Sequence, residues 1–336
     1  MKILILQLKR IGDLILTTPA IHCLREAFPE ARLTLVVDSS CQGLLRAIDV
    51  DECWVYHKGA SWGGLFGFGP NAWMKSDLSV FHGDFCLDFT GTDRSAWMTF
   101  SSACKRRLTF ERFRTKPLRR FLYTDFVDSS VRGRHTADHY TDLLQPLGIE
   151  RDGVPLDLRL SETLPALAKA LLAQGGVTAP YAVIHAGTAR PEKYWGPERW
   201  RQVMNLLHAQ YGLKIVLTGS TDPVEQAHLA AIKESFRGEC FDFSGKTDLL
   251  ELAAVIRGAK VFCGVDTAAM HLADAMGTPA VALFGPTNPF HWRPRHANAV
   301  VLRADTAPPF TPAQKGGPMD HITADAVIEA VQALVG

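Results

Sequence analysis

The segment 261–271, VFCGVDTAAMH, decides the fold class of this chain. Its first five residues are apolar or small, as in a buried β-strand, and the residues after Thr267 favour a helix. We therefore predict a strand, a polar turn at Asp266-Thr267 and a helix that begins at once. The first backbone N–H groups of such a helix are unpaired, and the helix dipole adds partial positive charge there. An anion such as a pyrophosphate is the expected occupant.

A second unit of the same kind follows directly. Gly277 is expected to end the helix, and the apolar run 279–284 leads into Gly285-Pro286-Thr287, a second turn that can approach a ligand closely. Because parallel strands bring their carboxyl ends to one edge of a sheet, the two turns should converge. The pattern predicts a nucleotide site.

Strand and helix signals alternate along both halves of the chain. Strands are predicted at 2–8, 32–37, 52–56, 85–88, 181–185, 214–218 and near Phe241. Helices are predicted at 42–47, 136–147, 164–172, 197–210, 223–235 and 249–257, with a further one opened by Thr18 as N-cap and Pro19. Repeated βα units indicate parallel sheets covered by helices on both faces.

The predicted fold class is α/β, with two Rossmann-like, doubly wound domains that face a central cleft. A length of 336 residues exceeds the usual size of one domain. We predict an N-terminal domain at 1–160, a linker at 161–180 and a C-terminal domain at 181–336. We leave open whether the last helix packs back on the N-terminal domain.

Composition excludes several classes of protein. No apolar run reaches the roughly 20 residues that span a bilayer. Charged residues interrupt the N-terminal apolar stretch at once, which favours a strand over an export signal. The seven cysteines are scattered and lack CxxC spacing, so free thiols in a reducing cytoplasm are expected rather than disulfides or a metal site.

The segment 105–134 is strongly basic, with ten Lys and Arg residues against three Asp and Glu and with aromatic residues interleaved. It is either a solvated helix face or a surface that contacts an anionic membrane or a phosphate-bearing substrate. The residues alone leave both open. Nucleic acid is not an expected partner, since no nucleic-acid-binding motif accompanies the segment.

Asp13 is the candidate catalytic base. It follows the first strand, and Gly12 would permit a tight exit from the sheet, so we expect Asp13 on a loop at the carboxyl end of that strand. A carboxylate there can take a proton from an attacking hydroxyl. Alternatively, Asp13 only caps the following turn.

In their order along the chain, the motifs resemble those of the ADP-heptose lipopolysaccharide heptosyltransferases, glycosyltransferase family 9, which have the GT-B fold. The matching elements are Gly12-Asp13, Pro19-Ala20, His185-Ala186-Gly187-Thr188 with Lys193 and Trp195, Thr218-Gly219-Ser220 with Glu225, Gly264-Val265-Asp266-Thr267 with His271, and Gly285-Pro286-Thr287. The resemblance covers nearly the whole chain and is loosest over about 55–135, in the domain that receives the acceptor in this family.

The resemblance implies an inverting transferase that moves heptose from ADP-L-glycero-D-manno-heptose to the lipopolysaccharide core. Asp13 would be the general base, and Lys193 would offset the charge that grows on the leaving diphosphate. The implied donor-binding residues are Gly187, Thr188, Thr218, Gly219, Ser220, Glu225, Asp266, Thr267, Ala268, His271, Gly285, Pro286 and Thr287. The implied acceptor-binding residues are Arg10, Gly12, Arg94 and Arg120.

For three of these residues, a purely structural role is the alternative to ligand binding. Lys193 could be a surface lysine, Glu225 an exposed helix glutamate, and His271 a satisfied core histidine. At the level of function, a family member that uses another sugar nucleotide or a protein acceptor stays open. So does an inactive nucleotide-binding assembly factor, although such a protein would need no base.

No cofactor and no metal are expected, because helix N-termini and Lys193 would replace a divalent ion. Asp49-Val-Asp51 resembles the metal-binding motif of other glycosyltransferases but lies in a helix-to-strand loop, and Gly67-Phe-Gly69 lacks the third glycine of a dinucleotide fingerprint. We expect a cytoplasmic monomer, held at the inner membrane by its basic face. The segment 61–69 is expected to be a mobile loop.

Overall fold

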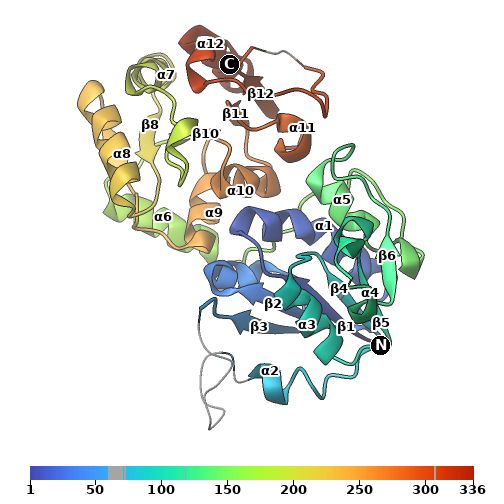
Figure 1. Ribbon diagram of the computed structural model, residues 1–336. Helices are drawn as coiled ribbons and strands as arrows, with labels where there is room; N and C mark the ends of the chain where they lie inside the picture. The colour runs from blue at the N-terminus through green and yellow to red at the C-terminus, as the bar shows by residue number, and fades with distance from the viewer. Residues whose placement is uncertain (60–70, 72, 118, 306–307) are drawn as a thin grey trace. The chain divides into compact units, whose positions relative to one another are not determined.

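The computed structural model describes residues 1–59, 71, 73–117, 119–305 and 308–336. The chain divides into two compact units, Met1–Arg159 and Leu160–Gly336. Each unit contains one six-stranded parallel sheet with helices packed on it (Figure 1). The segment 61–69, predicted as a mobile loop, lies outside the described residues.

The sheet of the first unit has the order β3-β2-β1-β4-β5-β6. Its strands are β1 Lys2–Gln7, β2 Arg32–Asp38, β3 Glu52–Tyr56, β4 Phe85–Asp88, β5 Arg106–Phe110 and β6 Asp125–Val127. The helices are α1 Ile11–Ala27, α2 Trp73–Ser76, α3 Asp93–Ser101, α4 Arg119–Leu122 and α5 Thr136–Asp142, with 3₁₀ turns η1 Ser39–Ala47, η2 Glu111–Thr115 and η3 Gln145–Leu147. Strand order reverses between β1 and β4, which makes that pair the switch point where such sheets bind ligands.

The helix after β1 begins earlier than predicted. Thr18 was expected to be its N-cap, but α1 starts at Ile11 and Pro19 lies inside it. The helix tolerates this proline because the Thr18 hydroxyl donates to the Ile15 carbonyl at 2.7 Å. That carbonyl is the acceptor that the missing N–H of Pro19 leaves free. As a consequence, Gly12 and Asp13 lie in the first turn of α1 and not on a loop.

The predicted helix 136–147 is likewise broken into α5 and η3. Pro146 has no N–H to donate to the carbonyl of Asp142, where α5 ends, so the α-helical ladder cannot continue. The 3₁₀ turn η3 replaces it, and Gly148 closes that turn at φ +79°.

The sheet of the second unit has the order β12-β11-β10-β7-β8-β9. Its strands are β7 Tyr181–His185, β8 Lys214–Leu217, β9 Cys240–Asp242, β10 Val261–Val265, β11 Ala280–Phe284 and β12 Ala299–Arg303. The helices are α6 Leu164–Gln174, α7 Pro197–Ala209, α8 Pro223–Ser235, α9 Leu249–Arg257, α10 Ala268–Met276, α11 Pro289–Trp292 and α12 Ala324–Val335, with 3₁₀ turns η4 Pro191–Lys193 and η5 Met319–His321.

Two segments at the margins of the second unit belong to it. The predicted linker 161–180 contains α6, which packs against α9. The last helix, α12, packs against α7 and against strands β10, β11 and β12.

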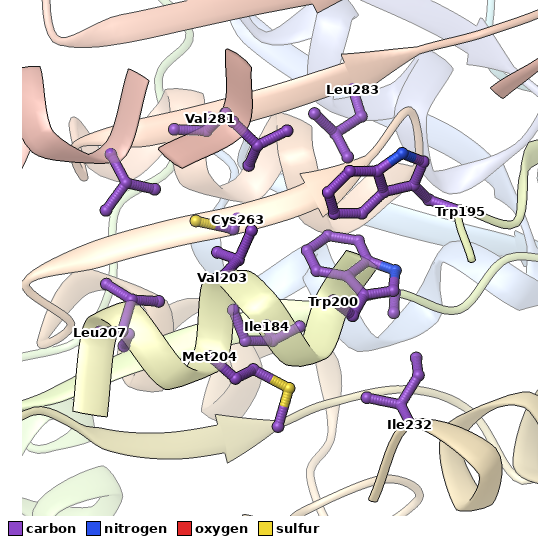
Figure 2. Close-up of a cluster of buried hydrophobic side chains, with 14 of the residues drawn as sticks. Ile184, Trp195, Trp200, Val203, Met204, Leu207, Ile232, Cys263, Val281 and Leu283 are labelled. Atoms are coloured by element: carbon purple, nitrogen blue, oxygen red, sulfur yellow. The ribbon is translucent and has the colours of Figure 1, made fainter. Parts of the chain in front are cut away.

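Two tryptophans anchor the core of the second unit. Trp195 and Trp200 are fully buried, and their rings meet edge to face with centroids 4.9 Å apart. Figure 2 shows the two indole rings in contact, with Trp200 carried by helix α7. The Trp195 indole N–H also donates to the Ile322 carbonyl at 2.9 Å. Because Trp195 follows Lys193 by two residues, this packing holds the backbone that carries Lys193.

The basic segment 105–134 is not a single helix face. It forms β5, η2, α4 and β6, and several of its charges are paired within the unit. The pairs are Lys105 with Asp84, Arg106 with Asp125, Arg114 with Glu111, Lys116 and Arg119 with Asp93, and Arg134 with Asp142 and Asp152. The helix-face interpretation is therefore wrong. The apolar pattern missed β5 because this strand begins with two arginines and has only two apolar residues, Leu108 and Phe110.

All seven cysteines are free thiols, as the scattered spacing predicts. Within the described ranges, no helix has the length and apolar character needed to cross a membrane.

Candidate active site

The predicted donor-binding residues gather at one edge of the second sheet. Strands β11, β10, β7 and β8 are neighbours, and the switch point lies between β10 and β7. Thr188 follows β7, Thr218–Ser220 follow β8, Asp266–Ala268 follow β10, and Gly285–Thr287 follow β11. Four sequence-distant motifs thus meet at the carboxyl ends of four adjacent strands.

Lys193 and Asp266 form a buried ion pair at this edge. The Lys193 ammonium donates to Asp266 Oδ2 at 2.6 Å and to the Asp266 carbonyl at 3.0 Å. Each side chain is 10% exposed, so the surface-lysine alternative is wrong. An ammonium has three N–H donors, and within the described residues two of them are engaged. The third is available to an anionic ligand.

Two threonine hydroxyls at the same edge have no hydrogen-bond partner in the described part of the chain. Thr267 is the N-cap of α10, a position whose hydroxyl usually accepts a bond from the helix, but its side chain makes no cap bond. Among the described residues, the buried hydroxyls of Thr267 and Thr287 make no hydrogen bond. A buried polar group without a partner costs about 1–3 kcal/mol. An oxygen-rich ligand would recover that free energy, and the N-terminus of α10 adds backbone donors.

Glu225 is buried, not exposed on its helix. It is 4% exposed, and its two carboxylate oxygens accept bonds of 2.7 Å each from the Ser220 N–H and hydroxyl. Gly187 and Gly219 leave room for this carboxylate, since a Cβ on them would lie 2.1 and 2.5 Å from Glu225 Oε1. The exposed-glutamate alternative is therefore wrong. Positions 187 and 219 require glycine because any larger residue would collide with Glu225.

Gly187→Ala should be destabilising and should weaken nucleotide binding, because the new Cβ displaces Glu225 from Ser220. Overpacking of this kind costs about 1–3 kcal/mol. Gly196→Ala is the matched control, since a Cβ there meets nothing within 4 Å. Chemical denaturation and calorimetric titration with ADP would compare the two. Equal behaviour of both variants would contradict the steric role of Gly187.

His185 is a site residue to which the sequence prediction assigned no role. Its Nδ1 lies 2.9 Å from the Thr218 hydroxyl. Burial lowers the pKa of His185 to about 4, against the opposing charge of Glu225. The imidazole is thus neutral at pH 7 and positions Thr218. His271, on α10, is 4% exposed, which fits both a core and a ligand-facing histidine.

In the first unit, Asp13 is held by a buried tyrosine. The Tyr140 hydroxyl donates to Asp13 Oδ1 at 2.6 Å, and the Lys9 ammonium donates to the Tyr140 hydroxyl at 3.2 Å. Tyr140 is 1% exposed, and burial together with the Asp13 charge raises its pKa well above the usual value. The phenol therefore stays protonated and keeps donating.

The second carboxylate oxygen of Asp13 differs from the first in its hydrogen bonding. Asp13 Oδ2 accepts no hydrogen bond within the described part of the chain, and the side chain is half-buried. No side chain caps the start of α1, so the capping role considered for Asp13 is wrong. One oxygen is anchored and the other is open, which suits a carboxylate that accepts a proton.

The predicted acceptor residues are spread over the first unit. Gly12 lies in the first turn of α1, and Arg10 is exposed just before it. The Arg94 guanidinium lies 5.0 Å from the centre of the Tyr56 ring, and Arg120 is exposed on α4.

Two cations interact with the charge of Asp13: burial lowers the pKa of Lys9 and of Arg112, and the Asp13 charge opposes that lowering in both. Arg112, in η2, stacks over the Phe113 ring at 4.6 Å. The sequence offered a weak signal for Lys9, four residues before Asp13, and pointed to Arg112 only as one of the ten basic residues of 105–134.

The two carboxylates of the Asp-x-Asp motif make ion pairs and hydrogen bonds within the first unit. Asp49 pairs with Arg25 and Arg159, and Asp51 pairs with Arg25 and accepts a bond from the Leu33 N–H. In the portion of the chain that the structure describes, no three His, Cys, Asp or Glu side chains are grouped to hold a metal ion. Metal independence stays a prediction.

The two parallel sheets, with polar side chains gathered at their switch points, define an α/β protein of the GT-B class. Residues 77–321 match the model of glycosyltransferase family 9 (heptosyltransferase), and the chain belongs to this family.

Relatives support the assignment. Lipopolysaccharide heptosyltransferase 3 of Escherichia coli K12 is 26% identical over 301 residues, which cover 87% of this chain and 85% of that protein. A glycosyl transferase family 9 structure from Veillonella parvula superposes with a TM-score of 0.84 at 25% identity, covering 99% and 97% of the two chains. The E. coli heptosyltransferase WaaC with ADP has a TM-score of 0.76 at 24% identity and 99% coverage of both chains.

Proposed function

We propose that this glycosyltransferase transfers heptose from ADP-L-glycero-D-manno-heptose to the lipopolysaccharide core, with inversion and without a metal. The observation that carries the proposal is the set of donors at one sheet edge: the buried Lys193 ammonium, the hydroxyls of Thr267 and Thr287, which have no partner among the residues described, and the α10 N-terminus. Such a set suits a diphosphate. The names of the relatives and the ADP in the WaaC structure support the same donor.

The proposed reaction is a single displacement. Asp13 takes the proton of an acceptor hydroxyl, the acceptor oxygen attacks the anomeric carbon, and the bond from that carbon to the diphosphate oxygen breaks. ADP leaves with the bonding electron pair. Lys193 and the N–H groups of α10 then offset the charge that grows on the diphosphate. This is the work that a divalent ion does in other transferases.

Donor preference tests the proposal. Nucleotide release should be at least about tenfold faster with ADP-heptose than with ADP-glucose, GDP-mannose or UDP-glucose when a purified lipopolysaccharide-core acceptor is supplied. EDTA should leave the rate unchanged. A GDP- or UDP-sugar as best donor would favour a family member with another substrate. ADP binding with no turnover of any donor would favour a nucleotide-binding assembly factor.

Tyr140→Phe should lower kcat about tenfold and leave the KM for the donor nearly unchanged. Its hydroxyl holds Asp13 Oδ1 through a hydrogen bond of 2.6 Å. Without that contact, the carboxylate is no longer fixed in one orientation toward the acceptor hydroxyl. Tyr123→Phe is the matched control, because Tyr123 donates a similar bond of 2.5 Å to a different carboxylate, Asp88. An equal loss of kcat in both variants would refute a specific role for Tyr140.

We further propose that the protein is a cytoplasmic monomer at the inner membrane. Phe121 is 75% exposed and stands next to the exposed Arg120, an apolar and cationic pair that suits an anionic lipid surface. The wild type should sediment with phosphatidylglycerol vesicles, and Phe121→Ser should stay in the supernatant. Equal sedimentation of both proteins would contradict the proposal that this surface binds the membrane.

A further inference from the structure

Arg303, the last residue of β12, carries a buried guanidinium that has no hydrogen-bond partner within the ranges the structure describes. It is 7% exposed, and among the described residues none of its three side-chain nitrogens makes a hydrogen bond. The carboxylate that interacts with its charge, Asp305, lies instead within 2.7 and 2.8 Å of His321 Nδ1. A guanidinium has five N–H donors, and leaving them unpaired away from water is costly.

A second buried arginine shows what a structural role looks like in this chain. Arg119 is 8% exposed, close to the value for Arg303. Its guanidinium donates to Asp93 Oδ1 at 2.7 and 2.9 Å and to the Gly91 carbonyl at 2.7 Å. Arg303 has equal burial and none of these contacts, so the fold itself does not account for it.

The register of the sheet places Arg303 on a definite face. Arg303 is paired in the sheet with Phe284 of β11. The neighbours Ala304 and Leu283 belong to the core under α7 and α12. Because side chains alternate along a strand, Arg303 and Phe284 lie on the opposite face, where α10 packs on β10 and β11.

Three adjacent strands therefore end in buried polar groups that have no hydrogen-bond partner among the described residues. These are Thr267 after β10, Thr287 after β11 and Arg303 at the end of β12. Neighbouring strands are about 4.8 Å apart, so the three ends span roughly 10 Å. A single elongated anion such as a diphosphate can reach across that width.

We propose that Arg303 binds a phosphate group of the nucleotide-sugar donor, as the third member of a row with Thr267 and Thr287. The inference rests on the proposed function and adds a residue that none of the sequence motifs includes. The planar guanidinium suits two parallel hydrogen bonds to a phosphate, and it is less hydrated than an ammonium. The contact is non-covalent, and Arg303 exchanges no proton with the donor.

Calorimetric titrations of the full chain with ADP, AMP and adenosine test the proposal. Arg303→Met should weaken ADP binding at least tenfold and leave adenosine binding within twofold of the wild type. Arg257→Met is the matched control, since Arg257 is exposed at the end of α9 in the same unit. It should bind all three ligands like the wild type. Without ligand, Arg303→Met should melt at the same or a higher temperature, because an unpaired buried charge is removed.

The outcomes separate this inference from the proposed function. If the wild type binds ADP and Arg303→Met binds it equally well, or loses ADP and adenosine equally, only the role of Arg303 is overturned. If the wild type fails to bind ADP, the proposed function fails first. If Arg303→Met and Arg303→Gln both fail to fold, Arg303 is a structural residue and the inference is overturned.

Discussion

Asp13→Asn is expected to abolish transfer while ADP binds as in the wild type. The substitution keeps the shape of the side chain and can still accept the Tyr140 hydrogen bond of 2.6 Å. It removes the charge that accepts the proton, and general-base catalysis contributes about 10²–10⁴-fold. We therefore expect kcat to fall by about 10³-fold. Steady-state ADP release with purified acceptor and calorimetric ADP titration are the two measurements.

The control for this experiment is Asp128→Asn, an exposed aspartate of the same unit. It should transfer heptose at the wild-type rate. Turnover by Asp13→Asn at the rate of the control would show that Asp13 is not the catalytic base. Loss of ADP affinity in parallel with kcat would point instead to a structural defect.

Lys193→Met is expected to lower kcat about 10²–10³-fold, the usual cost of removing one group that stabilises developing charge. It should also destabilise the protein. Asp266 would remain as a carboxylate with a 10% exposed side chain and no cationic partner. Breaking one half of a buried pair costs about 3–5 kcal/mol. A single variant therefore confounds catalysis with folding.

The double variant Lys193→Met/Asp266→Asn separates the two effects. It leaves no unpaired buried charge, so most of the lost stability should return in chemical denaturation. Activity should not return, because the ammonium that we propose to face the leaving diphosphate is still missing. Recovery of turnover together with stability would mean that Lys193 acts only as a structural partner of Asp266.

Local sequence signals determined most of the secondary structure. The strands Glu52–Tyr56, Phe85–Asp88 and Tyr181–His185 and the helices Pro223–Ser235 and Leu249–Arg257 have the predicted bounds. Their signals are local: a continuous apolar run, or an N-cap followed by helical periodicity. At Pro19 the prediction failed because a side-chain contact overrides the local rule: the Thr18 hydroxyl satisfies the carbonyl that proline leaves free. At 136–147 it failed because the local effect of Pro146 was not taken into account.

The candidate site also has features that local sequence patterns predict and features that only tertiary contacts decide. By itself, the sequence determined which residues follow the carboxyl ends of strands, because turn residues after apolar runs are a local pattern. Only the tertiary structure decided which of them touch. Lys193 meets Asp266 across 73 positions, and Tyr140 meets Asp13 across 127. Arg303 stands out only once its burial and missing partners are known. The reason is physical: an ion pair, an orienting hydrogen bond and an unpaired guanidinium are defined by distance and solvent exposure, and spacing along the chain specifies neither.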